Sequence, residues 1–81
     1  MLDYNECVSW GVIGDKVFVF NEETKDIFMF ANLTKEVWLL IKSVKEIDQL
    51  EMIINERQEK NLSAEISNVI NNLERKGLLK R

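Results

Sequence analysis

Carboxylates are the most numerous side chains in this sequence that could take part in acid–base chemistry, with 14 Asp and Glu residues among 81. Two sets lie close together, Glu22 with Glu23 and Glu56 with Glu59. Catalysis by carboxylates needs a neighbouring group that shifts a pKa or relays a proton. The chain has no histidine, and neither set has a basic partner at catalytic spacing. We therefore interpret these carboxylates as solvated charges and predict no catalytic residue.

Metal and cofactor chemistry is also poorly represented. The only cysteine is Cys7, so the chain has neither a disulfide framework nor, without histidine, a Cys/His zinc site. Gly11 and Gly14 lie between strand-like segments and are not followed by a helix, unlike the glycines of a phosphate-binding loop. We predict that the protein binds no metal and no cofactor.

The N-terminal segment and the single cysteine indicate a cytoplasmic protein. Residues 1–6 lack the basic region and the hydrophobic core of a signal peptide, and no stretch approaches the ~18–20 apolar residues of a membrane span. An isolated thiol such as that of Cys7 is typical of a reducing compartment. We expect a cytoplasmic location and no association with membranes.

Nucleic-acid binding is one hypothesis that the C-terminal part of the chain raises. A third helix there would expose Asn71, Asn72 and Arg75 to a major groove. Only Arg75 and the basic tail over residues 76–81 could contact phosphates, and the net charge of the chain is −3. We predict no nucleic-acid partner and keep a winged-helix DNA-binding regulatory protein as the alternative.

A peptide slot is the remaining candidate for a site. An apolar strand over Ile27–Phe30 would lie near an apolar helix that contains residues Ile66–Leu73. An exposed strand edge beside a helix can bind an extended peptide, because main-chain hydrogen bonds supply affinity and the adjoining groove selects alternate side chains. The opposite interpretation, in which all of these residues are core, stays open on the sequence alone.

The elements that must position this slot begin with strands. β-Branched and aromatic residues between turn signals predict three antiparallel strands in the first third of the chain. The predicted strands are Cys7–Ile13, Lys16–Asn21 and Ile27–Phe30. The two-residue turn Gly14-Asp15 sets the first register and pairs Ile13 with Lys16. The polar run at 21–26 forms the second turn.

Both faces of this sheet are apolar in the sequence, because Val17 and Val19 alternate with Phe18 and Phe20. One face must carry the helices that follow. We expect part of the other face, and the edge of the last strand, to stay open to a partner. Full wrapping of both faces by the helices and the N-terminal arm is the alternative.

After the third strand the hydrophobic period changes from 2 toward 3.6, which predicts three helices. The first helix follows a cap at Thr34 or Asn32 and is apolar nearly all round, so we place it at the centre of the core. The second begins near Lys45, and its end is not marked in the polar run that follows. Ser63 caps the third helix and Gly77 ends it. Three strands followed by three helices predict an α+β fold.

The composition agrees with one small folded domain. Hydrophobic residues make up 46% of the chain and charged residues 31%, which is a globular composition. A chain of 81 residues has little room for a second core. We therefore expect one domain over residues 1–81, with its core at about 7–79.

Hydrophobic and polar segments follow one another in a distinctive order over roughly four-fifths of the chain. They are Val17–Phe20, an acidic turn, Ile27–Thr34, Val37–Ile41, Glu46–Leu50, Val69–Leu73 and Gly77–Leu79. This ordered set resembles the PqqD-like family of RiPP recognition elements, which bind the leader peptides of ribosomally made, post-translationally modified peptides.

The resemblance implies a winged helix-turn-helix in which the leader peptide adds as an antiparallel strand beside the third strand, against the third helix. The third strand would then supply the backbone edge, and the third helix would supply a wall. The peptide-binding residues implied in this way are Asp26, Ile27, Phe28, Met29, Phe30, Ile66, Val69, Asn72, Leu73 and Lys76, with Glu65 placed to hold a polar or basic leader residue.

The resemblance also implies a stand-alone peptide chaperone that is not itself an enzyme. Its partners would be the precursor leader peptide and a separate modifying enzyme. That enzyme would be a leader peptidase of a lasso-peptide pathway, a radical SAM enzyme or a cyclase. A homodimer or enzyme subunit whose interface is the apolar sheet face fits the same features and stays open.

Overall fold

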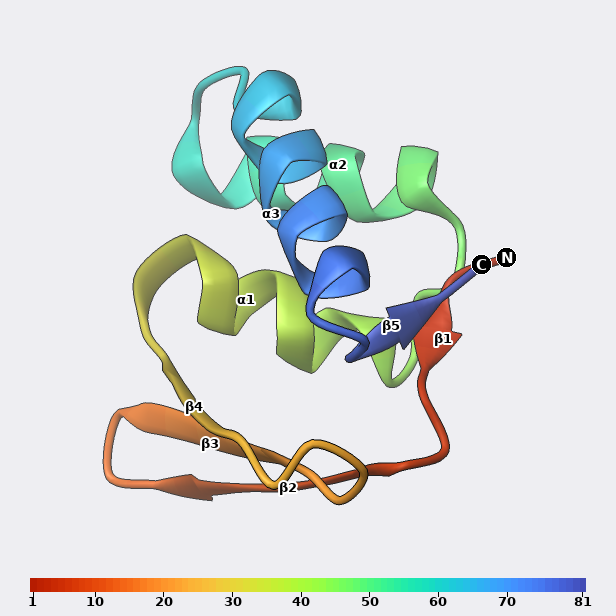
Figure 1. Cartoon of the computed structure of the whole chain (residues 1–81). Coiled ribbons are helices and arrows are strands. Elements are labelled where there is room, and N and C mark those ends of the chain that lie inside the picture. The colour runs from red at the N-terminus through yellow and green to blue at the C-terminus, as the bar shows by residue number, and fades with distance from the viewer.

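Five strands and three helices make up the computed structural model, which describes residues 1–81 (Figure 1). The strands are β1 (Asp3–Tyr4), β2 (Val8–Ile13), β3 (Lys16–Asn21), β4 (Ile27–Phe30) and β5 (Leu79–Lys80). The helices are α1 (Asn32–Ile41), α2 (Ile47–Gln58) and α3 (Ser63–Arg75). The predicted α+β fold, with three antiparallel strands followed by three helices, is confirmed. No helix has the length and apolar character needed to cross a membrane.

The hairpin of β2 and β3 has the predicted register. Ile13 pairs with Lys16, and Trp10 pairs with Val19. Gly14 adopts a φ of 62°, at the turn position that type II′ hairpins reserve for glycine. Because the loop is this short, it fixes which side chains of β3 face the helices.

Asn21 organises the turn between β3 and β4. Its side chain is buried, and its Oδ1 accepts the backbone N–H groups of Glu23 and Thr24 at 2.9 and 3.3 Å. Its Nδ2 donates to the carbonyl oxygen of Lys76 at 3.5 Å. One amide side chain therefore joins this turn to the C-terminal end of α3, and it brings the start of β4 beside that helix.

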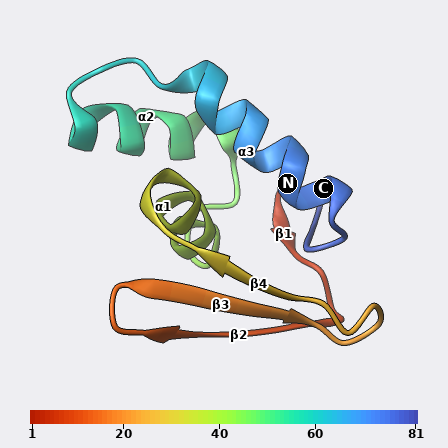
Figure 2. The ribbon, with the colours of Figure 1, turned by 60° about the vertical axis from the view of Figure 1, so that its left-hand side comes forward.

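The helices cover one face of the three-stranded sheet and leave the other face bare, as Figure 1 and Figure 2 show from two directions. Val17, Val19 and Phe30 lie on the covered face and are buried. Ile27 and Met29 lie on the bare face, where they are 70% and 58% exposed. The prediction that an apolar face stays open is confirmed, and the alternative of full wrapping is wrong.

The core is centred on α1, as predicted. Trp38 is fully buried, and its ring lies between aromatic rings from three other segments. The ring centroids are 4.6 Å from Tyr4, 5.8 Å from Phe30 and 6.0 Å from Trp10. This helix therefore connects the N-terminal segment, the inner face of the sheet and the other two helices in one cluster.

The start of α1 differs from the predicted cap. The residue before the helix is Ala31, which makes no side-chain capping hydrogen bond. Asn32 is already the first helical residue, with a φ of 54°, and Thr34 lies within the first turn. The prediction of a cap at Thr34 or Asn32 is wrong, because the cap position is held by Ala31, whose side chain cannot accept a hydrogen bond.

The connection between α2 and α3 depends on Asn55. Its Oδ1 accepts the backbone N–H of Leu62 at 2.7 Å, and its Nδ2 donates to Ser63 Oγ at 3.3 Å. Ser63 is the first residue of α3, and the cap position before it is occupied by Leu62, so the prediction of a cap at Ser63 is wrong. The end of α3 is as predicted, since Gly77 adopts a φ of 75°.

A second, two-stranded sheet was not predicted. β1 pairs with β5, so that Tyr4 lies opposite Leu79 and the two ends of the chain run side by side (Figure 1). Leu2 is buried beside this sheet, and its N–H donates to the carbonyl oxygen of Lys45 at 2.8 Å. The N-terminal arm is therefore a structural part of the core.

Tyr4 makes the stability of this arm depend on pH. Its O–H donates to the carbonyl oxygen of Trp38. Burial, with a contribution from the Asp3 carboxylate, raises the pKa of its phenol from 10.0 to about 12. The folded state holds this proton more tightly, so the free energy of unfolding should fall as the pH rises from about 10 to about 12. Urea unfolding of wild type and Tyr4→Phe measures this. The free energy of unfolding of the variant should fall less steeply with pH than that of wild type. An equally steep fall in both would assign the pH dependence to other groups.

Candidate functional site

β4 has one free backbone edge. It pairs with β3 only, because the order of the sheet is β2-β3-β4. The N–H of Asn21 donates to the carbonyl oxygen of Asp26 at 2.9 Å, so these two residues form a hydrogen-bonded pair. In an antiparallel ladder, hydrogen-bonded and non-hydrogen-bonded pairs alternate along the strands. The backbone groups of Phe28 therefore point toward β3, and those of Ile27 and Met29 point away from it. Two residues thus present unpaired N–H and C=O groups along this edge.

A flank of α3 lies beside the start of this edge. Glu65, Val69, Asn72 and Lys76 recur at spacings of three and four residues, so they share one stripe of the helix. The Nζ of Lys76 lies 6.0 Å from the centre of the Phe28 ring. Figure 2 shows α3 running antiparallel to β4, with its C-terminal end toward the start of the strand. We call this stripe, with Phe28 and the free edge of β4, the β4–α3 surface.

The structure separates the predicted site residues into four groups, the last of which is made up of exposed polar residues. The side chains of Ile27 and Met29 lie on the bare face of the sheet, while their backbones form the free edge. Phe28 and Val69 are half-buried against the core and can still be contacted. The third group consists of residues that are almost entirely inside the core, namely Phe30, Ile66 and Leu73.

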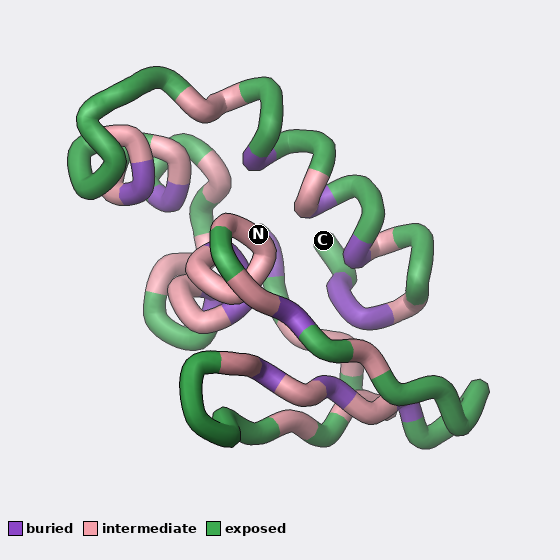
Figure 3. The backbone as a smooth tube through the Cα atoms, turned by 90° about the vertical axis from the view of Figure 1, so that its left-hand side faces the viewer, coloured by how far each residue is buried: buried purple, intermediate pink, exposed green.

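Burial of Ile66 and Leu73 changes the role expected of them. They are 0% and 2% exposed, so they hold α3 in place and offer a ligand almost no surface. Asp26, Glu65, Asn72 and Lys76 are exposed at the two ends and along the rim of the β4–α3 surface. In Figure 3 the exposed backbone runs along the outer side of α3 and through the β3–β4 turn.

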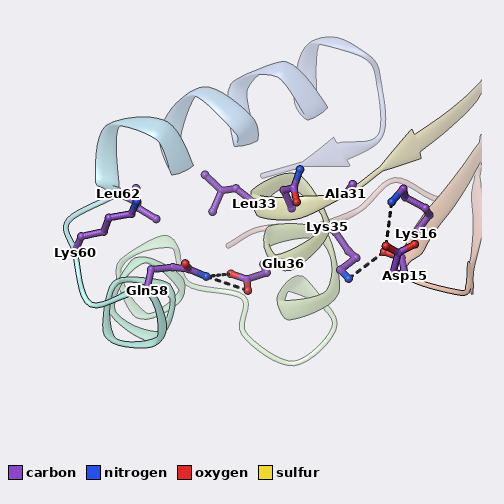
Figure 4. Close-up of a pocket in the computed structure, with 10 residues that line it drawn as sticks. Asp15, Lys16, Ala31, Leu33, Lys35, Glu36, Gln58, Lys60 and Leu62 are labelled. Atoms are coloured by element: carbon purple, nitrogen blue, oxygen red, sulfur yellow. Dashed lines mark hydrogen bonds and ion pairs between the residues drawn. The ribbon is translucent and has the colours of Figure 1, made fainter.

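The β4–α3 surface is an open strand edge with a stripe of α3 beside it. The cavities of the structure lie elsewhere. One of about 490 Å³ begins where β4 ends, and Figure 4 shows the side chains around it. Another of about 480 Å³ lies on the bare face of the sheet, between Ile13, Phe18, Phe20 and Ile27.

The cavity at the end of β4, which we call the β4-end cavity, is lined by residues from several segments. Asp15 and Lys16 come from the hairpin turn, and Lys35 comes from the first turns of α1. Lys60 and Leu62 come from the connection between α2 and α3. Sequence reasoning missed this cavity, because no local pattern indicates that residues so far apart in the chain line one cavity.

The basic C-terminal tail is largely engaged in ion pairs. Arg81 pairs with Glu74 at 2.9 Å, and Lys80 pairs with Glu6 at 3.0 Å. Lys76 has no ion-pair partner and lies over an aromatic ring instead. Two of the side chains that a DNA-binding protein would direct at phosphates, Lys80 and Arg81, are therefore turned to neighbouring carboxylates.

The structure brings no catalytic constellation together. No three Cys, Asp or Glu side chains gather where they could hold a metal ion. Burial raises the pKa of the Cys7 thiol, which favours its unreactive protonated form. The chemistry that the molecule offers is that of an open strand edge beside an apolar and cationic wall.

Comparisons with known proteins agree with this geometry. No family model and no curated protein matches the chain. A solved structure, TbiB1 in complex with the TbiA(beta) leader peptide, matches with a TM-score of 0.89 at 17% sequence identity. The match covers 96% of this chain and 94% of that chain. The likeness shows that the two proteins share a fold, and it confirms the predicted winged helix-turn-helix of three antiparallel strands and three helices.

Proposed function

We propose that this protein binds the leader peptide of a ribosomally made precursor by adding it as a strand to the free edge of β4. One observation carries the proposal. The unpaired backbone groups of Ile27 and Met29 lie beside the exposed flank of α3, in a fold shared with a protein solved with a leader peptide bound. Strand addition uses such an edge for affinity and the neighbouring pockets for specificity.

The alternation of β4 defines how an antiparallel leader would lie. Its residues opposite Ile27 and Met29 exchange backbone hydrogen bonds with the edge and turn their side chains to the bare face. The residue opposite Phe28 turns its side chain inward, toward Val69 and Lys76. An apolar or aromatic leader side chain fits this position, because Phe28 and Val69 are apolar and Lys76 can lie over a ring.

The remaining predicted residues contribute at the ends of the bound strand. Asp26 precedes the edge and Phe30 closes it, with the Phe30 ring acting as a buried support. Glu65 and Asn72 lie on the α3 stripe, where Glu65 can hold a polar or basic leader residue. Ile66 and Leu73 act indirectly, because they fix the position of the helix.

The protein in this proposal is a cytoplasmic adaptor and not a catalyst. Holding the leader raises the effective concentration of the precursor at a separate modifying enzyme. A leader peptidase, a radical SAM enzyme or a cyclase could each fill that role. The alternative of a DNA-binding regulator has little support, because the net charge is −3 and Lys80 and Arg81 of the tail are paired with carboxylates.

Met29→Pro tests the use of the free edge. Proline removes an N–H that points away from β3, so the sheet should fold while one backbone donor of the edge is lost. Peptides are first enriched on the wild-type protein from a displayed library of random sequences, and the best binder is called the pairing peptide. We expect Met29→Pro to raise the Kd of the pairing peptide about tenfold or more, measured by calorimetry.

Val12→Pro is the matched control. It lies on the outer edge of β2, is 54% exposed where Met29 is 58% exposed, and its N–H also points away from β3 by the same alternation. This variant should bind the pairing peptide like wild type. If no library peptide binds, or if Met29→Pro binds as well as Val12→Pro, strand addition at β4 is contradicted.

A further inference from the structure

The β4-end cavity lies where an added strand would enter the β4–α3 surface. Ala31 and Leu33, which follow β4 directly, line one side of it, and Leu62 at the start of α3 lines another (Figure 4). A leader that runs antiparallel to β4 passes Phe30 before it reaches Ile27. The residues that precede its pairing stretch therefore lie over this cavity and not over the β3–β4 turn.

The cavity is polar and carries an excess of positive charge. Only three of its ten lining residues are hydrophobic. Its charged side chains are Asp15, Glu36, Lys16, Lys35 and Lys60, three cations against two anions. A peptide segment that enters it meets ammonium groups more often than carboxylates.

The two carboxylates of the cavity are already occupied. Lys16 Nζ lies 3.1 Å from Asp15 Oδ2, and this contact holds the pKa of the Asp15 carboxyl below its usual value. Glu36 accepts hydrogen bonds from Gln58 Nε2 at 3.2 Å to both of its oxygens (Figure 4). Neither anion is left without a partner.

Two ammonium groups are left without an ion pair. Lys35 Nζ donates to the backbone carbonyl oxygen of Asp15 at 3.0 Å and to no carboxylate. Lys60 is exposed, and its Nζ has no hydrogen-bond or ion-pair partner. These two lysines come from opposite sides of the cavity, as Figure 4 shows.

We propose that the β4-end cavity is a second recognition subsite, which selects an acidic side chain just upstream of the pairing stretch of the leader through Lys35 and Lys60. This inference rests on the proposed function. Asp and Glu are the anionic side chains of an unmodified ribosomal peptide, so a carboxylate is the group that these ammonium groups would hold. The subsite would also set direction, because an acidic residue at the other end of the leader would lie away from both lysines.

The test uses the full chain and three synthetic forms of the pairing peptide. One carries Asp-Asp before its first residue, one carries Lys-Lys there, and one carries Asp-Asp after its last residue. We expect the first to bind roughly fivefold more tightly than the unmodified peptide, the second more weakly, and the third about equally. The gain should shrink as salt is added, because the lysines are exposed.

Lys60→Glu should abolish the gain from upstream Asp-Asp and favour upstream Lys-Lys. Lys42→Glu is the matched control, because it makes the same change of charge at the C-terminal end of α1, whereas the cavity lies at the start of that helix. It should keep the wild-type order of the three peptides. Both lysines lie on the surface, so circular dichroism should show that both variants are folded.

The outcomes separate this inference from the proposed function. A pairing peptide that binds at β4 without any preference for upstream acids overturns the subsite and leaves strand addition standing. A gain from downstream Asp-Asp in place of upstream Asp-Asp also overturns it, since the carboxylates would then act at the end of the peptide that lies away from Lys35 and Lys60. Loss of the preference for upstream acids in Lys42→Glu would mean that the preference comes from the net charge of the protein and not from the β4-end cavity. Failure of every library peptide to bind overturns both.

Discussion

Trp38→Ala should lower the free energy of unfolding by about 3–5 kcal/mol, the largest stability effect that we expect from a single substitution in this protein. The side chain is fully buried, and its ring contacts Tyr4, Trp10 and Phe30 with centroids at 4.6–6.0 Å. Truncation leaves a cavity at the junction of the N-terminal arm, the sheet and α1. For a domain of this size, whose stability is on the order of 4–12 kcal/mol, that loss takes a large share.

Trp38→Phe is the control for this prediction. The indole Nε1 is buried without a hydrogen-bond partner, so replacing Trp with Phe removes an unsatisfied donor as well as some apolar area. We expect Trp38→Phe to cost clearly less than Trp38→Ala in urea unfolding followed by circular dichroism. Equal costs would mean that an aromatic ring at this position stabilises the fold no more than a methyl group, and a cost below ~1 kcal/mol for Trp38→Ala would contradict its central place in the core.

The sheet could be predicted closely because its signals are local. Gly14-Asp15 joins two runs of β-branched and aromatic residues, and a loop of two residues leaves only one register. The pairing of Ile13 with Lys16 follows from that loop alone, and the structure has it. The open apolar face could be predicted as well, because Phe18 and Phe20 alternate with the valines that face the helices.

The elements that were missed depend on contacts between distant residues. β1 and β5 are two residues long, too short for any periodicity, and they form because burial of Leu2 and Leu79 brings the two ends of the chain together. The cap of α3 was assigned to Ser63 from its type. Instead, Asn55 accepts the N–H of Leu62 just before that helix, and Asn61 accepts the N–H of Ser63.

The candidate site was likewise predictable where the signal is local and was missed where it depends on tertiary contacts. Helical spacing alone places Val69 and Lys76 on one stripe of α3, and β alternation places Ile27 and Met29 along one edge. The sequence could not separate wall from core on that helix, and it is burial that assigns Ile66 and Leu73 to the core. The lysines of the β4-end cavity come to line one cavity only through the tertiary fold, so no spacing in the sequence predicts them.

Val69→Asp should have the largest effect on binding, a loss of roughly a hundredfold or more for the pairing peptide. Val69 is half-buried on the α3 stripe that faces the free edge of β4. A peptide strand that adds to this edge would cover position 69 and strip water from the new carboxylate, with no partner to replace it. The expected loss therefore reports on the helix wall, whereas Met29→Pro reports on the backbone edge.

Asn68→Asp is the matched control, because it adds the same charge one residue earlier on an exposed part of the same helix. The two side chains point about 100° apart around the helix axis, so only position 69 lies beside the strand. Asn68→Asp should bind like wild type, and both variants should keep their helical circular dichroism. If folded Val69→Asp binds normally while Met29→Pro does not, the leader uses the strand edge without the helix. If the two losses occur together, the edge and the α3 stripe act as one site.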